Sequence, residues 1–201
     1  MPSLPRSAEH GADSEALRAV LRREKLATRM ALDAATRGEL STRIEGHLTA
    51  LLAALPPQTL AFCAPVRGEF DARPLASLLL QRDWQAAMPV VVETAAPMRF
   101  RRWTPTCAMD VDRYGIPIPA DGAELIPAVV LLPLVAFDAQ GFRLGYGGGY
   151  FDRTLAAMVP HPLAIGVGFE LARVADIAPQ AHDIPLAAAV TEAGVEYFTR
   201  R

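Results

Sequence analysis

The chain has 201 residues, of which 51% are hydrophobic and 21% are charged, and its formal net charge is −2. This composition provides for a large apolar core and excludes global disorder. The charge balance gives no sign of a nucleic-acid partner, and no long apolar run free of charge and proline exists to span a membrane.

The cysteines and the first residues favour the cytoplasm. Cys63 and Cys107 form neither a C-x-x-C pair nor a disulfide framework, which is typical of a reducing compartment. Residues 1–12 contain Pro, Ser and Gly but no apolar segment, so we expect no signal peptide. We therefore expect a cytoplasmic protein without a membrane partner, and we expect it to be a monomer.

The chain is predicted to begin with a disordered tail over residues 1–12, followed by a single α/β domain over residues 13–201. Asp13 or Ser14 can cap the first helix, which forms an N-terminal extension. Its apolar residues share one face and its basic residues lie largely off that face. These are Leu17, Val20 and Leu21, and Arg18, Arg22, Arg23 and Lys25. Such a basic face is either solvated or reaches a polyanionic ligand.

The rest of the chain alternates between helices and strands. Apolar periodicity predicts helices over residues 33–55, 70–82 and 150–158. Apolar runs predict strands over residues 59–64, 87–92, 98–103, 129–137, 163–169 and 187–190. Residues 104–127 form a long connection rich in Pro, Gly and Asp. This order predicts a three-layer α/β sandwich, in which helices cover both faces of a mainly parallel sheet.

A glycine-rich turn, Gly145-Tyr-Gly-Gly-Gly149, precedes the predicted helix 150–158. Free N–H groups at the positive end of a helix dipole suit an anion such as phosphate. No G-K-[ST] follows, so the turn is not a P-loop, and Tyr150 stands where a dinucleotide fingerprint has its third glycine. The turn is therefore either an anion site or a packing turn, and the flanking Arg143 and Arg153 favour the anion.

Three polar features follow predicted strands, and ligands in such sheets bind outside the carboxyl ends of the strands. They are the glycine-rich turn, Glu69 and Asp183. Asp152 lies in the first helical turn, where its carboxylate has one of two roles. It either interacts favourably with the helix dipole, or it binds a hard cation beside phosphates with Asp183 as a second carboxylate. Taken alone, Glu69 and Asp183 are also compatible with ordinary loop positions.

The central stretch resembles the signature of a known family. Residues 132–138 read Leu-Pro-Leu-Val-Ala-Phe-Asp, and residues 141–155 read Gly-x-Arg-Leu-Gly-x-Gly-Gly-Gly-Tyr-Phe-Asp-Arg-x-Leu. This pattern strongly resembles the 5-formyltetrahydrofolate cyclo-ligase (5,10-methenyltetrahydrofolate synthetase) family. Matching segments elsewhere are Leu17-Arg18, Pro65-Val-Arg-Gly-Glu69-Phe-Asp71, Tyr114-Gly-Ile-Pro-Ile-Pro119 and His182-Asp-Ile-Pro-Leu186.

The resemblance implies an enzyme that converts 5-formyltetrahydrofolate to 5,10-methenyltetrahydrofolate with ATP and Mg²⁺, releasing ADP and phosphate. It implies catalytic roles for Arg143 and Tyr150 and a metal site at Asp152 and Asp183. The implied ATP-binding residues are Arg18, Arg22, Arg143, Leu144, Gly145, Tyr146, Gly147, Gly148, Gly149, Tyr150, Phe151 and Arg153. The implied folate-binding residues are Ala64, Glu69, Gly147, Gly148, Gly149 and Tyr150.

The chain departs from the family pattern at three positions. Ser14 stands where a lysine is frequent, Tyr146 where an arginine is frequent, and Ile118 where a glutamate is frequent. Two alternatives stay open beside the cyclo-ligase reaction. One is the same fold acting on another folate-like or ATP-dependent substrate, and the other is a non-catalytic protein that binds folate or a nucleotide.

Overall fold

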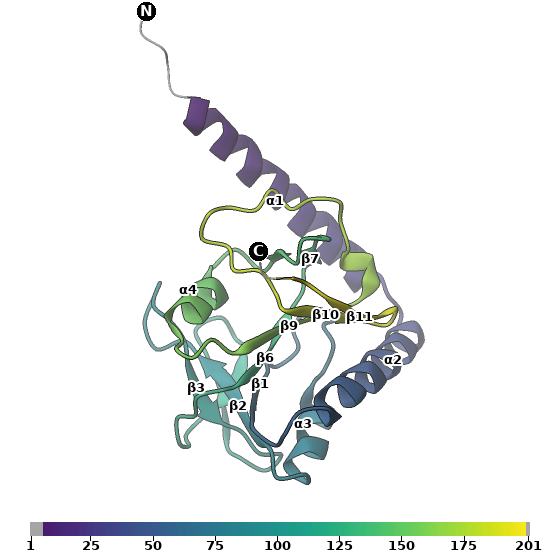
Figure 1. Ribbon diagram of the computed structural model, residues 1–201, viewed down its shortest axis with the longest axis vertical. Coiled ribbons are helices and arrows are strands. Elements are labelled where there is room, and N and C mark those ends of the chain that lie inside the picture. The colour runs from purple at the N-terminus through teal and green to yellow at the C-terminus, as the bar shows by residue number, and fades with distance from the viewer. Residues whose placement is uncertain (1–5, 200–201) are drawn as a thin grey trace, which may run out of the picture.

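Residues 6–199, which the computed structural model describes, fold around one large sheet (Figure 1). The helices are α1 (Arg6–Met30), α2 (Ala34–Ala53), α3 (Arg73–Leu80), α4 (Tyr150–Ala157) and the short 3-10 helix η1 (Glu170–Ala172). The sheet has the spatial order β11 (Gly194–Tyr197), β10 (Ala188–Thr191), β9 (Leu163–Val167), β6 (Val129–Pro133), β1 (Thr59–Ala61), β2 (Gln85–Val90) and β3 (Arg99–Arg102).

The central strands β10, β9, β6, β1 and β2 are parallel, and the two edge strands β11 and β3 are antiparallel to their neighbours. Strand β6 pairs with β1 on one side and with β9 on the other. Its residues from Val129 to Leu132 are all buried, because both faces of a parallel sheet are covered. The predicted mainly parallel sheet is confirmed.

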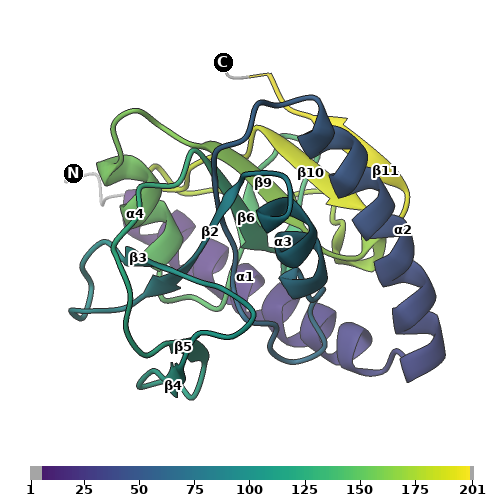
Figure 2. The same cartoon turned by 90° about the horizontal axis from the view of Figure 1, so that it is seen from below.

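Alternate residues of each strand point to opposite faces of the sheet, and each face has its own helices. Leu60, Val129 and Leu131 share a core with α2 and α3. Ala61 and Val130 share a second core with α4. Figures 1 and 2 show α2 and α3 together on one side of the sheet and α4 on the other. This is the predicted three-layer arrangement.

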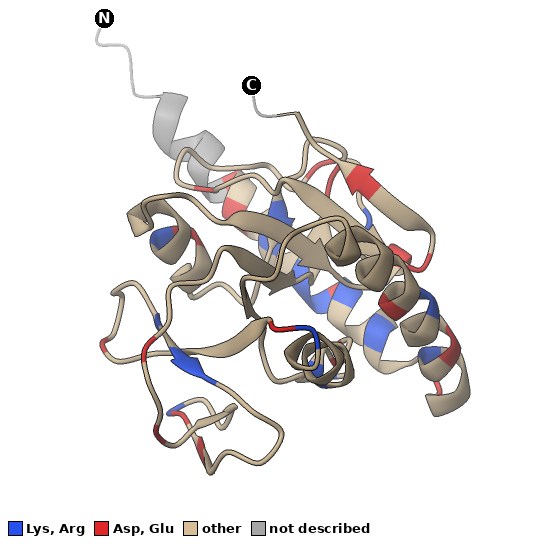
Figure 3. Cartoon of the chain, turned by 60° about the horizontal axis from the view of Figure 1, so that its bottom comes forward, with Lys and Arg blue, Asp and Glu red and all other residues tan. Residues whose placement is uncertain are grey.

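Helix α1 lies outside both layers and crosses near the carboxyl ends of the parallel strands, where it contacts η1 and β7. Its basic residues, marked in Figure 3, include four that are spaced along one face and bond to the body of the protein. These are Arg18, Arg22, Lys25 and Arg29. Of the two alternatives for the basic face, the solvated one is therefore wrong for Arg18, Arg22 and Lys25. The apolar residues Leu17 and Val20 are instead 42% and 37% exposed.

The prediction for the N-terminus also needs correction. Helix α1 begins at Arg6, so residues 6–12 are helical and neither Asp13 nor Ser14 caps the helix. This segment contains Arg, Ala and Glu, which have good helix propensity. Residues 1–5 of the predicted tail and residues 200–201 of the predicted domain lie outside the described part of the chain. Within residues 6–199, no helix is long and apolar enough to cross a membrane.

The predicted strand 129–137 is two strands. Strand β6 ends at Pro133, which lacks an N–H group for further pairing. The chain then forms β7 (Ala136–Phe137), which pairs with β8 (Arg143–Leu144). The Asp138 carboxylate closes the turn between them by accepting the N–H groups of Gln140 and Phe142.

Three further elements differ from the prediction. The connection 104–127 contains a small hairpin of β4 (Met109–Val111) and β5 (Pro117–Pro119). The carboxylate of Asp112 closes this hairpin by accepting the N–H groups of Tyr114 and Ile116. Edge strand β11 was not predicted. The strand predicted over residues 59–64 pairs only at Thr59–Ala61, and the chain then turns outward toward Pro65.

Candidate functional site

A pocket of about 610 Å³ opens at the carboxyl ends of the parallel strands. Its walls come from α1, the loop after β1, the β4–β5 hairpin, the glycine-rich turn and the segment before β10. The glycine-rich turn, Glu69 and Asp183 all line it, so their predicted convergence is confirmed. The pocket is large enough for a drug-sized ligand.

The glycine-rich turn leads directly into α4. Gly149 is the N-cap residue of α4 and has φ 62°, and Gly147 has φ 93°, a region that disfavours residues with a Cβ. A Cβ on Gly148 would lie 2.9 Å from the Tyr150 ring. The turn therefore brings main-chain atoms close to the pocket at the positive end of α4.

Arginines surround this turn. Arg22 Nε donates to the carbonyl oxygen of Gly145 at 3.1 Å. Arg153 donates to the Gly148 carbonyl oxygen, and its Cζ lies 5.1 Å from the centroid of the Tyr150 ring. The Nε of Arg153 is buried without a hydrogen-bond partner among residues 6–199. The positive charge of these arginines suits an anionic ligand at the turn.

The buried Arg143 pairs with the half-buried Asp152 near the turn. Arg143 Nη2 lies 3.2 Å from Asp152 Oδ1, and Nη1 donates to the Ile184 carbonyl oxygen at 2.9 Å. The Ile184 N–H also donates to Asp152 Oδ1, at 3.1 Å. Burial lowers the pKa of Arg143, while the nearby carboxylates of Asp152 and Asp183 act to raise it. Asp152 and the 183–184 segment are thus held together.

Arg18 forms a two-bond ion pair with Asp183. Its Nη1 lies 2.6 Å from Oδ2 and its Nη2 lies 3.1 Å from Oδ1, and the two side chains are only 7% and 4% exposed. The Gln180 N–H donates to Oδ2 at 2.7 Å. Burial acts to raise the pKa of Asp183, but the hydrogen bonds from Arg18 and Gln180 outweigh it and the pKa is lowered.

The two aspartates are the candidate metal ligands. Within residues 6–199, no group of three or more His, Cys, Asp or Glu side chains is arranged to hold a metal ion. Mg²⁺ needs only one or two carboxylates when substrate phosphates and water complete its shell. In the described part of the chain, Oδ2 of Asp152 accepts no hydrogen bond, whereas both oxygens of Asp183 bond to Arg18. Asp152 therefore fits a metal directly, and Asp183 fits if Arg18 gives way.

Glu69 lies at the other end of the pocket, with a side chain that is only 6% exposed. Its Oε1 accepts the hydroxyl of Tyr146 at 2.5 Å and lies 3.5 Å from Arg29 Nη2. Its Oε2 accepts the Val66 N–H at 3.0 Å. Burial raises the pKa of Glu69, and the bonds from Tyr146 and Val66 and the charges of Arg29 and Arg67 partly oppose this.

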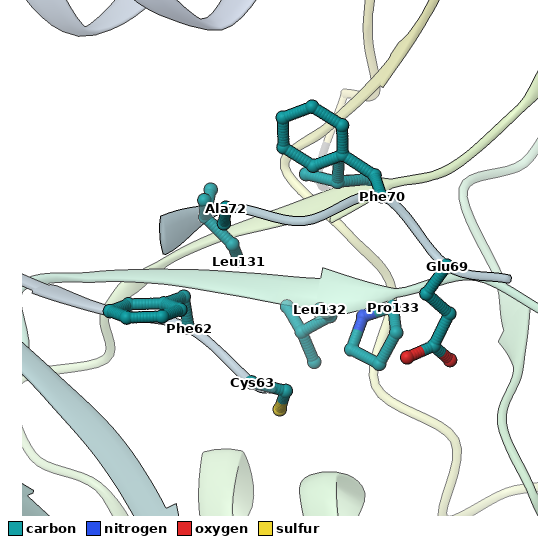
Figure 4. Close-up of a pocket in the computed structure, with 9 residues that line it drawn as sticks. Phe62, Cys63, Glu69, Phe70, Ala72, Leu131, Leu132 and Pro133 are labelled. Carbon is teal, nitrogen blue, oxygen red and sulfur yellow. The ribbon is translucent and has the colours of Figure 1, made fainter. Parts of the chain in front are cut away.

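A smaller cavity of about 20 Å³ lies behind Glu69, with space for about one water molecule. Figure 4 shows Glu69 and Pro133 at one end of it and Phe62 and Ala72 at the other. Cys63 lines both cavities, and burial raises the pKa of its thiol. The Cys63 thiol is therefore protonated at neutral pH.

Most of the predicted site residues line the large pocket. They are Arg18, Arg22, Ala64, Glu69, Arg143, Gly145, Tyr146, Gly147, Gly148, Gly149, Tyr150, Phe151, Asp152 and Asp183. Two predicted ATP-binding residues do not line it. Leu144 lies on β8, and its side chain is buried in a core with Ala136 and Ile177. Arg153 reaches the turn from the side of α4 rather than from the pocket.

Arg29, Arg67 and Tyr114 are among the contributors to the site that sequence reasoning missed. Arg29 contacts Tyr146 and Glu69 at one end of the pocket. Its position continues the 4-3-4 spacing of Arg18, Arg22 and Lys25, and this spacing could have placed it on the same helix face. Arg67 lies next to Glu69 in the loop. Tyr114 reaches the pocket from the β4–β5 hairpin, and its hydroxyl lies 2.8 Å from that of Tyr150. No signal in the sequence indicated the last contact.

Comparison with known proteins gives consistent results. The model of the 5-formyltetrahydrofolate cyclo-ligase family matches residues 14–192. A 5-formyltetrahydrofolate cyclo-ligase of Escherichia coli K12 is 32% identical over 151 residues, which are 70% of this chain and 83% of that protein. One from Mycolicibacterium smegmatis is 29% identical over 182 residues, covering 85% of this chain and 91% of that protein.

Solved structures agree with these matches. The NMR structure of Aquifex aeolicus 5,10-methenyltetrahydrofolate synthetase superimposes with a TM-score of 0.80 and 29% identity, over 92% of this chain and 94% of that chain. A 5,10-methenyltetrahydrofolate synthetase from Mycoplasma pneumoniae shares the fold, with a TM-score of 0.72 at 23% identity, over 87% of this chain and 98% of that chain.

Proposed function

The chain belongs to the 5-formyltetrahydrofolate cyclo-ligase family, and we propose that its large pocket is the active site. There it converts 5-formyltetrahydrofolate to 5,10-methenyltetrahydrofolate, with ATP as co-substrate and ADP and phosphate as further products. One observation carries this assignment. A single cavity joins a glycine-rich helix N-terminus, suited to phosphates, to the buried Glu69, suited to a ligand with N–H donors.

The ATP phosphates are assigned to the glycine-rich turn. Main-chain N–H groups from Gly145 to Gly149 approach the phosphates, and Arg22 keeps the turn in place through the Gly145 carbonyl oxygen. Arg18 and Arg143 supply positive charge from the adjoining wall. Phosphoryl transfer depends mainly on positioning and on charge neutralisation, and this end of the pocket offers both.

Asp152 and Asp183 are assigned to Mg²⁺, which when bound neutralises charge on the nucleotide phosphates. Asp152 is ready for this role because its Oδ2 faces no competing donor within the described residues. Asp183 takes part when Arg18 leaves it. Arg18 is then free to bond to a phosphate oxygen, which exchanges one anionic partner for another.

The folate is assigned to the Glu69 end. The pterin ring of tetrahydrofolate carries adjacent N–H donors, and a carboxylate accepts such a pair. Ala64 lies next to Glu69 in the pocket wall, and Tyr150 provides an aromatic surface between the two ends. The formyl group of a folate held at Glu69 therefore faces the phosphates of the nucleotide.

The reaction follows from this placement. The formyl oxygen attacks the γ-phosphorus of ATP, and the bond to ADP breaks. The activated formyl carbon is then attacked by N10, which loses its proton, and the carbon–oxygen bond breaks to release phosphate. Arg143 stabilises the charge on the transferred phosphoryl group, and the Tyr150 hydroxyl orients the formyl group.

We also propose that the protein works as a monomer in the cytoplasm, without nucleic-acid or membrane partners. The pocket is built from one chain, and ATP is available in that compartment. The free cysteines Cys63 and Cys107 fit a reducing environment.

An absorbance assay tests the proposed function. Purified protein mixed with MgATP and 5-formyltetrahydrofolate is expected to form the methenyl product, followed by its near-ultraviolet absorbance. ATP without 5-formyltetrahydrofolate, and 5-formyltetrahydrofolate without ATP, are the controls. Absence of an ATP-dependent signal contradicts the proposal, and ligand binding without turnover favours a non-catalytic binding protein.

A further inference from the structure

We propose that Tyr146 is a positioning residue for Glu69, and that Tyr146, Arg29 and Glu69 form one unit that orients the folate-binding carboxylate. Tyr146 therefore serves the folate and not the ATP phosphates, although it lies in the glycine-rich turn. The inference rests on the proposed function and adds a residue role to it.

The side chain of Tyr146 and its main chain face different partners. The neighbouring Gly145 carbonyl oxygen is held by Arg22. The Tyr146 hydroxyl lies 2.5 Å from Glu69 Oε1 and 2.6 Å from Arg29 Nη2. The ring is flanked by Arg67, whose Cζ is 5.5 Å from the ring centroid. The residue is 42% exposed overall, yet its polar atom bonds to two side chains that are nearly inaccessible to solvent.

The direction of these hydrogen bonds is fixed by chemistry. A guanidinium can only donate, so Arg29 donates to the Tyr146 oxygen. The single hydroxyl hydrogen of Tyr146 is then directed to Glu69, which accepts it as a carboxylate. Arg29 is itself fixed, because it donates to the carbonyl oxygens of Leu134 and Arg67 at 3.0 Å each. Each hydrogen bond of the unit thus has one possible direction, and main-chain carbonyl oxygens hold Arg29 in place.

The chain of hydrogen bonds decides what Glu69 presents to the pocket. Oε1 receives Tyr146 and Oε2 receives the Val66 N–H, which together fix the plane of the carboxylate. The remaining lone pairs form a fixed acceptor pair for a ligand with two adjacent N–H donors, as on the pterin. An arginine at position 146 would bring a formal charge, whereas tyrosine brings a neutral donor.

The ionisable groups around Glu69 come from several elements. Arg29 belongs to α1, Arg67 to the loop of Glu69 itself, Tyr146 to the glycine-rich turn, and Cys63 to the segment after β1. Burial raises the pKa of Glu69 and the Tyr146 hydrogen bond lowers it. Loss of that bond raises the pKa further, so Glu69 becomes protonated at higher pH.

The test is Tyr146→Phe, with KM measured separately for each substrate. We expect KM for 5-formyltetrahydrofolate to rise by roughly 10-fold, as for the loss of a hydrogen bond to a charged group. KM for ATP is expected to stay within about twofold of wild type. The acid limb of kcat/KM for the folate is expected to move to higher pH. The control Tyr197→Phe, an exposed residue of β11, changes neither KM.

A double mutant shows whether Tyr146 acts through Glu69. In a Glu69→Gln background, Tyr146→Phe is expected to add less than about twofold to the equilibrium Kd for 5-formyltetrahydrofolate, because coupled residues are non-additive. Direct binding also covers variants with low turnover, and thermal unfolding checks that each variant is folded.

Two results overturn the inference. One is a folate KM for Tyr146→Phe that is unchanged, and the other is an increase in KM for ATP alone. The second result would assign Tyr146 to the phosphates, and Tyr146→Arg would then lower KM for ATP. Both outcomes require an active wild type, so they are distinct from failure of the proposed function, in which wild type forms no methenyl product.

Discussion

Arg18 and Asp183 illustrate how single residues serve both the stability and the chemistry of this protein. Each is buried, and each satisfies the other with two hydrogen bonds. Removing one partner of a buried ion pair leaves a charge without compensation, which costs much more than the pair contributes. The pair therefore fixes α1 to the segment before β10. Losing either residue lowers the free energy of unfolding.

Arg18→Ala is expected to lower the free energy of unfolding by about 3 kcal/mol at pH 7. Urea unfolding of both proteins measures this difference. The pKa of Asp183 is lowered in the folded protein, so the stabilisation is present above the ordinary carboxyl pKa and is lost as pH falls through the folded value. The difference between variant and wild type should therefore shrink in acid.

The control for this experiment is Arg23→Ala, which removes an exposed arginine of the same helix. Its effect is expected to lie within about 0.5 kcal/mol of zero. An equal loss of stability in both variants would mean that a feature common to the arginines of α1, and not the Arg18–Asp183 pair, is responsible. A difference that does not shrink in acid would also contradict the role of Asp183.

The site residues that belong to a sequence motif or follow a predicted strand were predictable. The glycine-rich turn, Glu69 and Asp183 follow strands, Asp152 lies in the first turn of the next helix, and all of them line the pocket. The partners of Glu69 were not predictable, because Tyr146 stands 77 positions away and only the fold brings the two together. The family resemblance implied that Leu144 binds ATP, but strand alternation turns its side chain into a core.

At the scale of elements, the glycine-rich turn and α4 act as one part. The turn has no room for a side chain at Gly148, because the ring of Tyr150 begins the helix directly beside it. Aromatic rings are rigid, so an added methyl group moves the ring and not merely a flexible end. The geometry of the turn and the position of Tyr150 are therefore coupled.

Gly148→Ala is expected to lower kcat by between about 10- and 100-fold, because a shift of reacting groups by about 1 Å costs about 100-fold. Steady-state kinetics with both substrates at saturation measures the loss. Gly46→Ala in α2 is the matched control, since a Cβ there meets no atom within 4 Å. It should leave kcat unchanged and raise stability by about 0.5–1 kcal/mol. Unchanged turnover in Gly148→Ala would show that Tyr150 does not need its present position.

The type of each long element was predictable, and the departures have local causes. Buried parallel strands read as continuous apolar runs, so their ends are set by features that hydropathy does not report. Strand β6 stops at Pro133, and the run beyond it belongs to a separate hairpin closed by Asp138. The face that α1 presents was predicted wrongly, because its arginines find carbonyl and carboxylate partners that only the tertiary structure supplies.

At the scale of the whole molecule, the pocket depends on parts from both ends of the chain. Helix α1 and the segment around Asp183 form one wall, and the glycine-rich turn and the loop of Glu69 form the others. A ligand that fills this pocket contacts several elements at once. Binding therefore raises the free energy of unfolding of the whole domain, by an amount set by ligand concentration and affinity.

MgATP at about 100 times its Kd is expected to stabilise the protein by about 2.7 kcal/mol. For a chain of this size, that corresponds to a rise in Tm of about 5–10 °C. Differential scanning fluorimetry measures the shift, and ATP with excess chelator is the control, expected to give a smaller one. Equal shifts with and without Mg²⁺ would contradict the metal role of Asp152 and Asp183.

The basic face of α1 has a consequence for which substitutions the protein tolerates. Lys25 bonds to the carbonyl oxygens of Leu171 and Arg173, Arg22 to that of Gly145, and Arg29 to that of Leu134. Every residue type has a carbonyl oxygen, so replacing Leu171 or Leu134 leaves these bonds available. Replacing Lys25 removes two of them at once. At these carbonyl contacts the surface that receives the helix can change its side chains, whereas the helix cannot. The contacts of Arg18 with Asp183 and of Arg29 with Tyr146 differ, because there both side chains are needed.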